Sequence, residues 1–309
     1  MTTLLYTHAT CLEHDPGPGH PESSARLSAI LAALKAPQFA ALQWREAPTA
    51  TVEQLARIHT PAHIERTLSR IPRNGYQAID GDTVVSPQSG AAALRAAGAV
   101  CAAVDAVLQG EANSAFCAIR PPGHHAEPNQ AMGFCLFNNI ALGAAHARAV
   151  HGLERVAAID FDVHHGNGTQ AAFEHDPAYL YISTHQAYIY PGTGRRDERG
   201  INNIVNIPLL ANSGTAELQH AWQEDIEPAL RRFQPQLILI SAGFDAHRLD
   251  PLAGLTFTET DYAWLTEKIL AIAAEFAQGR VVSALEGGYN LSALAASTAA
   301  HVKALMQAD

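Results

Sequence analysis

VAAIDFDVHHGNG, residues 156–168, is the stretch of sequence from which the fold can be worked out. It opens with apolar residues that are mostly small or β-branched, which predicts a strand buried on both faces of a parallel sheet. Asp160, Asp162 and His164 follow at alternate positions, and side chains two residues apart on a strand point to the same side. We therefore expect these three side chains to project together where the strand ends. Two glycines then turn the chain into a helix that begins near Thr169.

Length and composition narrow the class of protein. The chain has 309 residues, of which 48% are hydrophobic, so a sizeable core can form. The net charge of −10 argues against a nucleic-acid partner. The four cysteines form no C-x-x-C pair, which argues against a thiolate zinc site and a disulfide framework and fits a reducing compartment. We find no signal-peptide pattern and no uninterrupted apolar run long enough to span a bilayer. We expect a cytoplasmic protein without a membrane partner, and its oligomeric state stays open, a homo-oligomer included.

Strand-like and helical segments alternate along the chain. A short strand is expected at residues 4–6, and helices at 22–34 and 260–278. Ser86 and Pro87 predict the cap and first turn of a long alanine-rich helix that ends at Gly110. Five further strands each run into a loop of glycine with His, Asp or Tyr: 115–119, 156–162, 179–183, 236–241 and 280–285. The alternation predicts one α/β domain over residues 1–309 with a parallel sheet, and ligands bind such sheets at the carboxyl ends of the strands.

Asp162, His164 and Asp245 are candidate metal ligands. Two carboxylates and one imidazole leave a tetrahedral ion with an open position, which is the arrangement of a catalytic rather than a structural zinc. A single aspartate at a strand end can equally be a helix cap or a loop brace, and Asp245 alone fits that reading. The D-x-D-x-H-H-G spacing at residues 160–166 favours the metal site.

His124 and His125 follow a rigid R-P-P-G loop at residues 120–123 and can present both rings to one substrate. A neutral imidazole can accept a proton from water, and an imidazolium can deliver one to a leaving amine. Asp160 and Asn167 are available as partners for the two rings. The alternative is a pair of loop histidines bonded to backbone. We expect a structural role for His165, because its side chain should point in the opposite direction from that of His164.

Tyr289, in the E-G-G-Y-N segment of residues 286–290, could donate its hydroxyl to a developing oxyanion. The paired glycines permit close backbone approach. A turn tyrosine that only packs is the alternative.

Taken together, six motifs resemble the successive signatures of the zinc-dependent histone deacetylase family. The N-G-T version of the third motif, with G-P-G-H-P-E at 17–22, is similar to the class II branch and to compact deacetylase-like amidohydrolases. The six motifs are R-P-P-G-H-H-A (120–126), G-F-C (133–135), D-F-D-V-H-H-G-N-G-T (160–169), Y-P-G-T-G (190–194), S-A-G-F-D (241–245) and L-E-G-G-Y (285–289).

The resemblance implies the arginase/deacetylase fold, a single α/β domain with a central parallel sheet of eight strands flanked by helices. It implies a zinc-dependent amidohydrolase that removes acetyl or other short acyl groups from the lysine side chain of peptides or proteins. Zinc would lie on the three candidate ligands. His125 would act as general base, His124 as its electrostatic partner held by Asp160, and Tyr289 would stabilise the tetrahedral intermediate. Class I members brace the second histidine with an aspartate, where this chain has Asn167.

The resemblance also assigns the substrate path and further ions. Arg26 resembles the residue beside the exit path of the acetate product. The tunnel would use Gly133, Phe134 and Tyr190, with Leu252 near its mouth. Independently of the resemblance, Asp80 or Asp82 could hold a substrate backbone at the rim, and a solvated turn is the alternative for this segment. One potassium ion would be held by Asp160, Ser183 and the carbonyls of Asp162, His164 and Thr184. A second would use carbonyls around Phe173, Asp176 and Tyr179.

Other functions stay open at this point. The same site could hydrolyse an acetylpolyamine or another small amide, although Leu252 stands where polyamine-preferring relatives carry a glutamate. A dimanganese ureohydrolase is disfavoured, because Gly166 stands where another bridging carboxylate would be needed. A catalytically silent acyl-lysine-binding protein is the alternative from a different class. Iron(II) suits the ligand set as well as zinc.

Overall fold

The fold is built on one wholly parallel sheet. The computed structural model describes residues 2–307, and within them eight strands pair in the order β2-β1-β5-β10-β9-β6-β7-β8. The predicted α/β class and eight-stranded parallel sheet are therefore confirmed. The strands are β1 (Thr3–Thr7), β2 (Gln43–Glu46), β5 (Ser114–Cys117), β6 (Val156–Asp160), β7 (Tyr179–Gln186), β8 (Ile204–Leu209), β9 (Leu237–Ala242) and β10 (Val281–Leu285).

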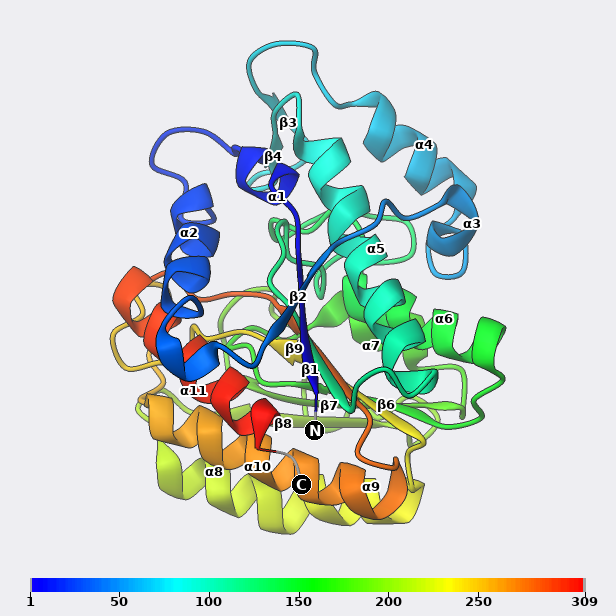
Figure 1. Cartoon of the computed structure of the whole chain (residues 1–309), viewed down its shortest axis with the longest axis vertical. Helices are drawn as coiled ribbons and strands as arrows, with labels where there is room; N and C mark the ends of the chain where they lie inside the picture. The colour runs from blue at the N-terminus through cyan, green and yellow to red at the C-terminus, as the bar shows by residue number, and fades with distance from the viewer. Residues whose placement is uncertain (1, 308–309) are drawn as a thin grey trace.

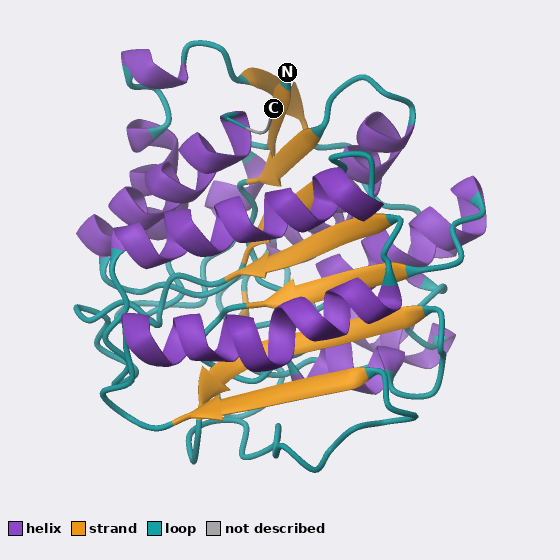
Figure 2. Cartoon of the chain, turned by 90° about the horizontal axis from the view of Figure 1, so that it is seen from below, coloured by secondary structure: helices purple, strands orange, loops and turns teal. Residues whose placement is uncertain are grey.

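Helices cover both faces of this sheet (Figure 2). Helices α5 and α6 pack against each other and against central strands, while α2, α10 and α11 pack together elsewhere (Figure 1). A small hairpin, β3 (Gln77–Ala78) with β4 (Val84–Val85), lies apart from the sheet. The helices are α1 (Thr10–Glu13), α2 (Ser24–Ala33), α3 (Val52–Leu55), α4 (Pro61–Ser69), α5 (Ser89–Leu108), α6 (Asn139–His151), α7 (Asn167–Phe173), α8 (Thr215–Ala221), α9 (Glu227–Phe233), α10 (Glu259–Phe276) and α11 (Leu291–Met306), with a 3₁₀ turn, η1 (Pro37–Phe39), and a π-helical segment between α8 and α9, η2 (Trp222–Ile226).

The strand order brings the polar loops together. Strands β5, β10, β9, β6 and β7 are five consecutive neighbours in the sheet, and they carry the five loops singled out in the sequence. Every residue of β5, β6, β9 and β10 is buried, as expected for strands covered by helices on both faces. Because all five run in the same direction, their loops meet at one edge of the sheet.

Two of the predicted boundaries are wrong. Strand β6 ends at Asp160 rather than residue 162, because the carboxylate of Asp160 accepts the N–H of Asp162 at 3.1 Å and the chain turns there. Asp162 and His164 therefore lie in the turn and not on the strand. Helix α5 begins at Ser89, and Ser86 with Pro87 forms the turn before it, where the Ser86 N–H donates to the Ser89 hydroxyl at 2.8 Å. Edge strands β2 and β8 were not recognised as segments.

Helix α5 is long and apolar enough to cross a membrane by length and composition alone. The expectation that the chain has no such segment therefore needs this correction. Of its most apolar window, 67% is buried inside the protein, where the helix packs on α6 and β5. Its apolar character is thus accounted for by its place in the core.

Candidate active site

The three candidate metal ligands meet at the carboxyl edge of the sheet. His164 Nδ1 lies 3.1 Å from Asp162 Oδ1 and 3.2 Å from Asp245 Oδ2. One ligand atom from each residue lies within 4.8 Å of the others. Both carboxylates are about 1% exposed. Although the strand ends before Asp162, the turn and the loop after β9 still bring together the set predicted from the sequence.

Two glycines make room for these carboxylates. A Cβ atom at Gly243 would lie 2.1 Å from Asp162 Oδ2, and one at Gly287 would lie 2.0 Å from Asp245 Oδ2. Real side chains do not approach so closely, so any residue larger than glycine would displace a carboxylate. The glycines of the S-A-G-F-D and L-E-G-G-Y motifs therefore have a steric role at the ligand set.

The charges of the three groups fit a cation. Burial and the neighbouring charge of Asp162 raise the pKa of Asp245 to about 7. Burial opposes the charged form of His164, but hydrogen bonds to Asp162 and Asp245 raise its pKa to about 10. Within the described residues, Asp245 Oδ2 has only the close approach of His164 Nδ1, at 3.2 Å, and no further hydrogen-bond donor. Two buried carboxylates and one imidazole are a donor set suited to a divalent metal ion.

The histidine pair lies beside the ligands, and each ring has the partner predicted for it. His124 Nδ1 lies 3.0 Å from Asp160 Oδ2, and His125 Nδ1 lies 2.8 Å from Asn167 Oδ1. The other end of the Asn167 amide donates to Glu127 Oε1 at 2.7 Å, which sets its oxygen towards His125. His125 therefore carries its proton on Nδ1, and its Nε2 is free to accept another.

The two rings have opposite electrostatic environments, although their centroids are only 4.0 Å apart. Burial disfavours charge on His124, but the carboxylates of Asp162 and Asp160 raise its pKa well above its usual range. Burial, His124 and His164 lower the pKa of His125 well below its usual range. The pair is thus divided into a cationic ring and a neutral one, which is the pattern of groups with different acid–base roles.

A pocket of about 240 Å³ opens onto the ligands and the histidine pair. Tyr289 reaches it from the loop after β10, with its backbone N–H bonded to Asp250 Oδ2 at 2.7 Å. Burial raises the pKa of Tyr289, so its hydroxyl remains a donor. The pocket is lined by Asp82, Pro122, His124, His125, Gly133, Phe134, His164, Tyr190, Leu252, Gly287 and Tyr289.

Every residue predicted for the tunnel wall is in this lining, and the aromatic rings of Phe134 and Tyr190 stand on it. The two candidate rim carboxylates differ. Asp80 accepts the N–H groups of Asp82 and Thr83, so it braces a turn, whereas Asp82 lines the pocket. The alternative of a turn residue with no contact to substrate therefore fits Asp80.

Arg26 is fully buried and lies behind the tyrosine loop rather than in the pocket lining. Its guanidinium donates to the carbonyls of Gly288 and Glu286 and to the carboxylate of Glu22, and it lies 4.9 Å from the Tyr289 ring centre. Arg26 thus anchors the loop that carries Tyr289. Its role beside the exit path of the acetate product stays a prediction.

Glu286 is a site residue to which sequence reasoning assigned no role. Its Oε2 accepts the backbone N–H of Gly123 at 2.6 Å and of His124 at 3.1 Å, and its Oε1 accepts the hydroxyl of Ser241. Burial raises the pKa of Glu286 to about 7. Its carboxylate ties three strand ends together. The sequence held a signal for this role, because an acidic residue directly after a mostly apolar strand is expected to be buried and to need a partner.

The predicted potassium ligands divide into two groups. Asp160 and Ser183 pair in register on β6 and β7, and both are fully buried, so their oxygens suit one monovalent cation. The carbonyls of Phe173, Asp176 and Tyr179 instead accept hydrogen bonds from one side chain, Asn203. The residues present therefore do not fit a second ion there.

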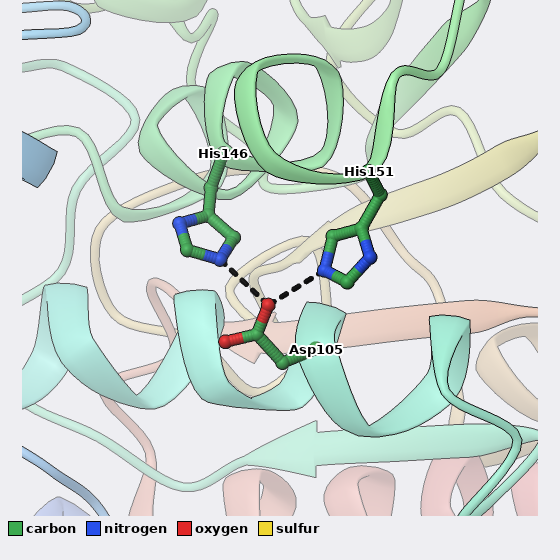
Figure 3. A group of neighbouring side chains, drawn as sticks. All are labelled: Asp105, His146 and His151. Atoms are coloured by element: carbon green, nitrogen blue, oxygen red, sulfur yellow. Dashed lines mark hydrogen bonds and ion pairs between the residues drawn. The ribbon is translucent and has the colours of Figure 1, made fainter.

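Figure 3 shows a second group of potential metal ligands, in which the Nε2 atoms of His146 and His151 each lie 2.7 Å from Asp105 Oδ1. Arg57 lies on the far side of His146, with Nη1 2.5 Å from Nδ1. Because a guanidinium can only donate, the proton of His146 is on Nε2 and is given to Asp105. A metal ion would need that nitrogen unprotonated, so the group is a hydrogen-bonded brace between α5 and α6.

His165 also has the structural place expected for it. Its two ring nitrogens lie 2.8 Å from Thr193 Oγ1 and 2.9 Å from Gln170 Oε1, and it does not line the pocket.

Residues 20–305 match the model of the histone deacetylase domain. This chain belongs to the histone deacetylase family.

The relatives of this histone deacetylase family member agree with that assignment. This chain is 42% identical to "Histone deacetylase 14, chloroplastic" of Arabidopsis thaliana, over 99% of this chain and 77% of that one. It is 40% identical to "Histone deacetylase-like amidohydrolase" of Pseudomonas aeruginosa, over 93% and 82%. The crystal structure of the HDA15 HD domain superposes with a TM-score of 0.94 at 35% identity and covers 99% of this chain and 90% of that one.

The resemblance stated from the six motifs is thereby confirmed. Family membership and the names of the relatives make this deacetylase family member a hydrolase of the deacetylase and amidohydrolase type. Because one relative is named chloroplastic, the cytoplasmic location stays a prediction.

Proposed function

We propose that this protein is a zinc-dependent amidohydrolase that removes acetyl or other short acyl groups from the lysine side chain of peptides or proteins. The observation that carries the proposal is the convergence of Asp162, His164 and Asp245 with the two histidines and Tyr289 at one pocket. Each of these groups has a role in hydrolysing an amide, and no simpler structural role accounts for all of them.

Zinc held by Asp162, His164 and Asp245 would polarise the acyl carbonyl and lower the pKa of water. The protein supplies the remaining chemistry. His125, neutral and free at Nε2, accepts a proton from the attacking water and later returns it to the leaving amine. His124, held as a cation by Asp160, stabilises the negative charge that develops beside it. The hydroxyl of Tyr289 donates a hydrogen bond to the oxyanion of the tetrahedral intermediate.

The pocket walls favour an alkyl-amine carrier. Phe134 and Tyr190 present aromatic surfaces suited to the methylene groups of a lysine side chain. Leu252 lines the mouth with an apolar side chain that is 42% exposed. An apolar mouth suits a substrate whose only polar groups are the amide at the bottom and a peptide backbone outside.

A second candidate substrate, an acetylpolyamine, is favoured by one residue. Asp82 also lines the pocket, and its carboxylate could pair with the distal ammonium group of a polyamine. Comparison of kcat/KM for acetylputrescine and an acetyl-lysine peptide separates the two candidates. Lysine deacylation predicts the higher value for the peptide, and Asp82→Asn should then weaken the binding of both substrates without reversing that order.

The direct test of the proposal is a panel of substrates run with metal-reconstituted enzyme. The acyl group is varied from acetyl to longer chains, and the amine carrier is varied between lysine peptides, free lysine and polyamines. We expect metal-dependent hydrolysis of short acyl-lysine peptides. If no member of the panel is hydrolysed although zinc is bound, the alternative of a silent acyl-lysine-binding protein replaces this proposal.

A further inference from the structure

The side chain of Asn203 lies at the place where the family resemblance predicts a second potassium ion. Its Nδ2 donates to the carbonyl oxygens of Phe173 at 2.8 Å, Asp176 at 3.0 Å and Tyr179 at 3.0 Å. The residue is only 6% exposed and lies just before β8. Three carbonyls, spaced three residues apart between the end of α7 and the start of β7, thus converge on one amide nitrogen.

The orientation of this amide is fixed by its other end. Asn203 Oδ1 accepts the N–H of Ile201 at 3.2 Å. Gly200 makes room for the oxygen, since a Cβ atom there would lie 2.7 Å from it. Turning the amide over would point its oxygen at three carbonyl oxygens and its NH₂ group at an N–H donor. The hydrogen-bond network therefore determines which end faces the carbonyls.

The amide and a cation cannot both occupy this place. A potassium ion bound by these carbonyls would have to lie about as far from the three oxygens as the Asn203 nitrogen does, because carbonyl oxygens around the ion stand in for its hydration shell. The amide hydrogens carry the partial positive charge that the oxygens need. Phe173 is the last residue of α7, and its carbonyl oxygen also accepts the N–H of Asp176 at 3.0 Å, so the Asn203 amide occupies its second acceptor position.

We propose that Asn203 permanently replaces the second cation, so that this protein binds one potassium ion where the resemblance implies two. The proposal rests on the proposed function only for the identity of the first ion, at Asp160 and Ser183. It has a consequence for the catalytic centre. Helix α7 begins at Asn167, which holds His125, and its far end is fixed by a covalently attached amide and not by an exchangeable ion.

Thallium(I), which replaces potassium and scatters anomalously, gives the first test. Crystals of the zinc-loaded wild-type protein, grown in thallium salt without potassium, should show no anomalous peak among the carbonyls of Phe173, Asp176 and Tyr179. A peak there, with the Asn203 side chain turned away, would overturn the proposal. Absence of a peak beside Asp160 and Ser183 would instead count against the first ion alone, so the two failures are distinguishable.

The isosteric variant Asn203→Asp gives the second test. Its carboxylate would place a negatively charged oxygen against three carbonyl oxygens, a repulsion that a bound cation relieves. When KCl replaces N-methylglucamine chloride at equal ionic strength, the Tm of Asn203→Asp should rise by several degrees more than that of wild type. A thallium peak should also appear at the carbonyls.

Asn129→Asp is the matched control, because Asn129 is exposed and its side chain hydrogen-bonds with Thr60 and not with this turn, and its rise in Tm should equal that of wild type. Equal rises for Asn203→Asp and wild type, with no new thallium peak, would contradict the proposal. If Asn203→Asp does not fold, the wild-type thallium map still decides it.

Discussion

The imidazole of His125 donates a hydrogen bond from Nδ1 to the amide oxygen of Asn167 at 2.8 Å. An amide holds the ring in the tautomer needed by a base, but it does not stabilise the imidazolium as a carboxylate does. The neutral form of His125 is therefore favoured, in keeping with its lowered pKa.

Asn167→Asp should raise the pKa of His125. Because the base acts in its neutral form, the acid limb of the kcat/KM profile should move to higher pH by about one unit. The introduced carboxylate would lie against that of Glu127 and be repelled by it. The double variant Asn167→Asp/Glu127→Gln removes this repulsion, and the shift of the acid limb should persist in the double variant. An unchanged acid limb in both variants would mean that His125 is not the titrating base.

Glu286→Ala should disturb the histidine pair through its backbone. The change leaves the buried N–H groups of Gly123 and His124 without an acceptor, at a cost of about 1–3 kcal/mol for each. We expect a loss of at least about 2 kcal/mol in unfolding free energy, measured in urea, and a lower kcat with zinc content unchanged. Glu286→Gln keeps an acceptor oxygen and should recover most of both losses; equal damage in the two variants would show that charge, and not hydrogen bonding, is what matters.

Gly287→Ala should expel the metal. The added Cβ would lie 2.0 Å from Asp245 Oδ2 and 2.6 Å from Asp162 Oδ2, so the carboxylates must move apart. Zinc content after dialysis and kcat should both fall by on the order of 100-fold, within the range found when metal-site support is removed. Gly81→Ala, where the new methyl meets open space, should retain zinc. Full zinc occupancy in Gly287→Ala would contradict the geometry described for the ligand set.

Acid should destabilise the protein through its buried neutral histidines. His301 is fully buried between the hydroxyls of Thr266 and Ser283, and burial lowers its pKa from 6.5 to about 3. Because the folded-state pKa lies below the unfolded one, its contribution is complete above pH 6.5 and is lost as pH falls towards 3. Between pH 7.5 and 5.5 wild type should lose about 1.4 kcal/mol more unfolding free energy than His301→Gln. Urea unfolding at both pH values measures this, and identical losses would contradict it.

Much of the fold was predictable because its strands are continuous apolar runs and its ligand loops follow them directly. Strand β8 was missed because Asn206 and Pro208 interrupt its apolar residues, and β2 because it is exposed throughout. The end of β6 was misplaced because the Asp160 carboxylate takes over a backbone hydrogen bond. Hydrogen bonds between a side chain and the nearby backbone cannot be predicted from the pattern of apolar and polar residues.

The candidate site was predictable as a set of residues, but less so as a network. Ligand and histidine motifs are short and local, so their members could be named from spacing. The roles of Glu286 and Asn203 depend on partners 163 and 30 positions away in the chain. Such contacts exist only after folding. The position of Glu286 after a mostly apolar strand indicates a buried partner, but neither the identity of its partners nor the role of Asn203 could be read from the sequence.

The central claim is that a metal ion on Asp162, His164 and Asp245 acts together with Tyr289. The most direct measurement is kcat on an acetyl-lysine peptide as zinc is titrated into metal-free wild type and the Tyr289→Phe variant. We predict no turnover without metal, full activity at one zinc per chain, and a Tyr289→Phe variant that binds the same zinc but is slower by about 10²–10³. Full activity in metal-free wild type would contradict the account.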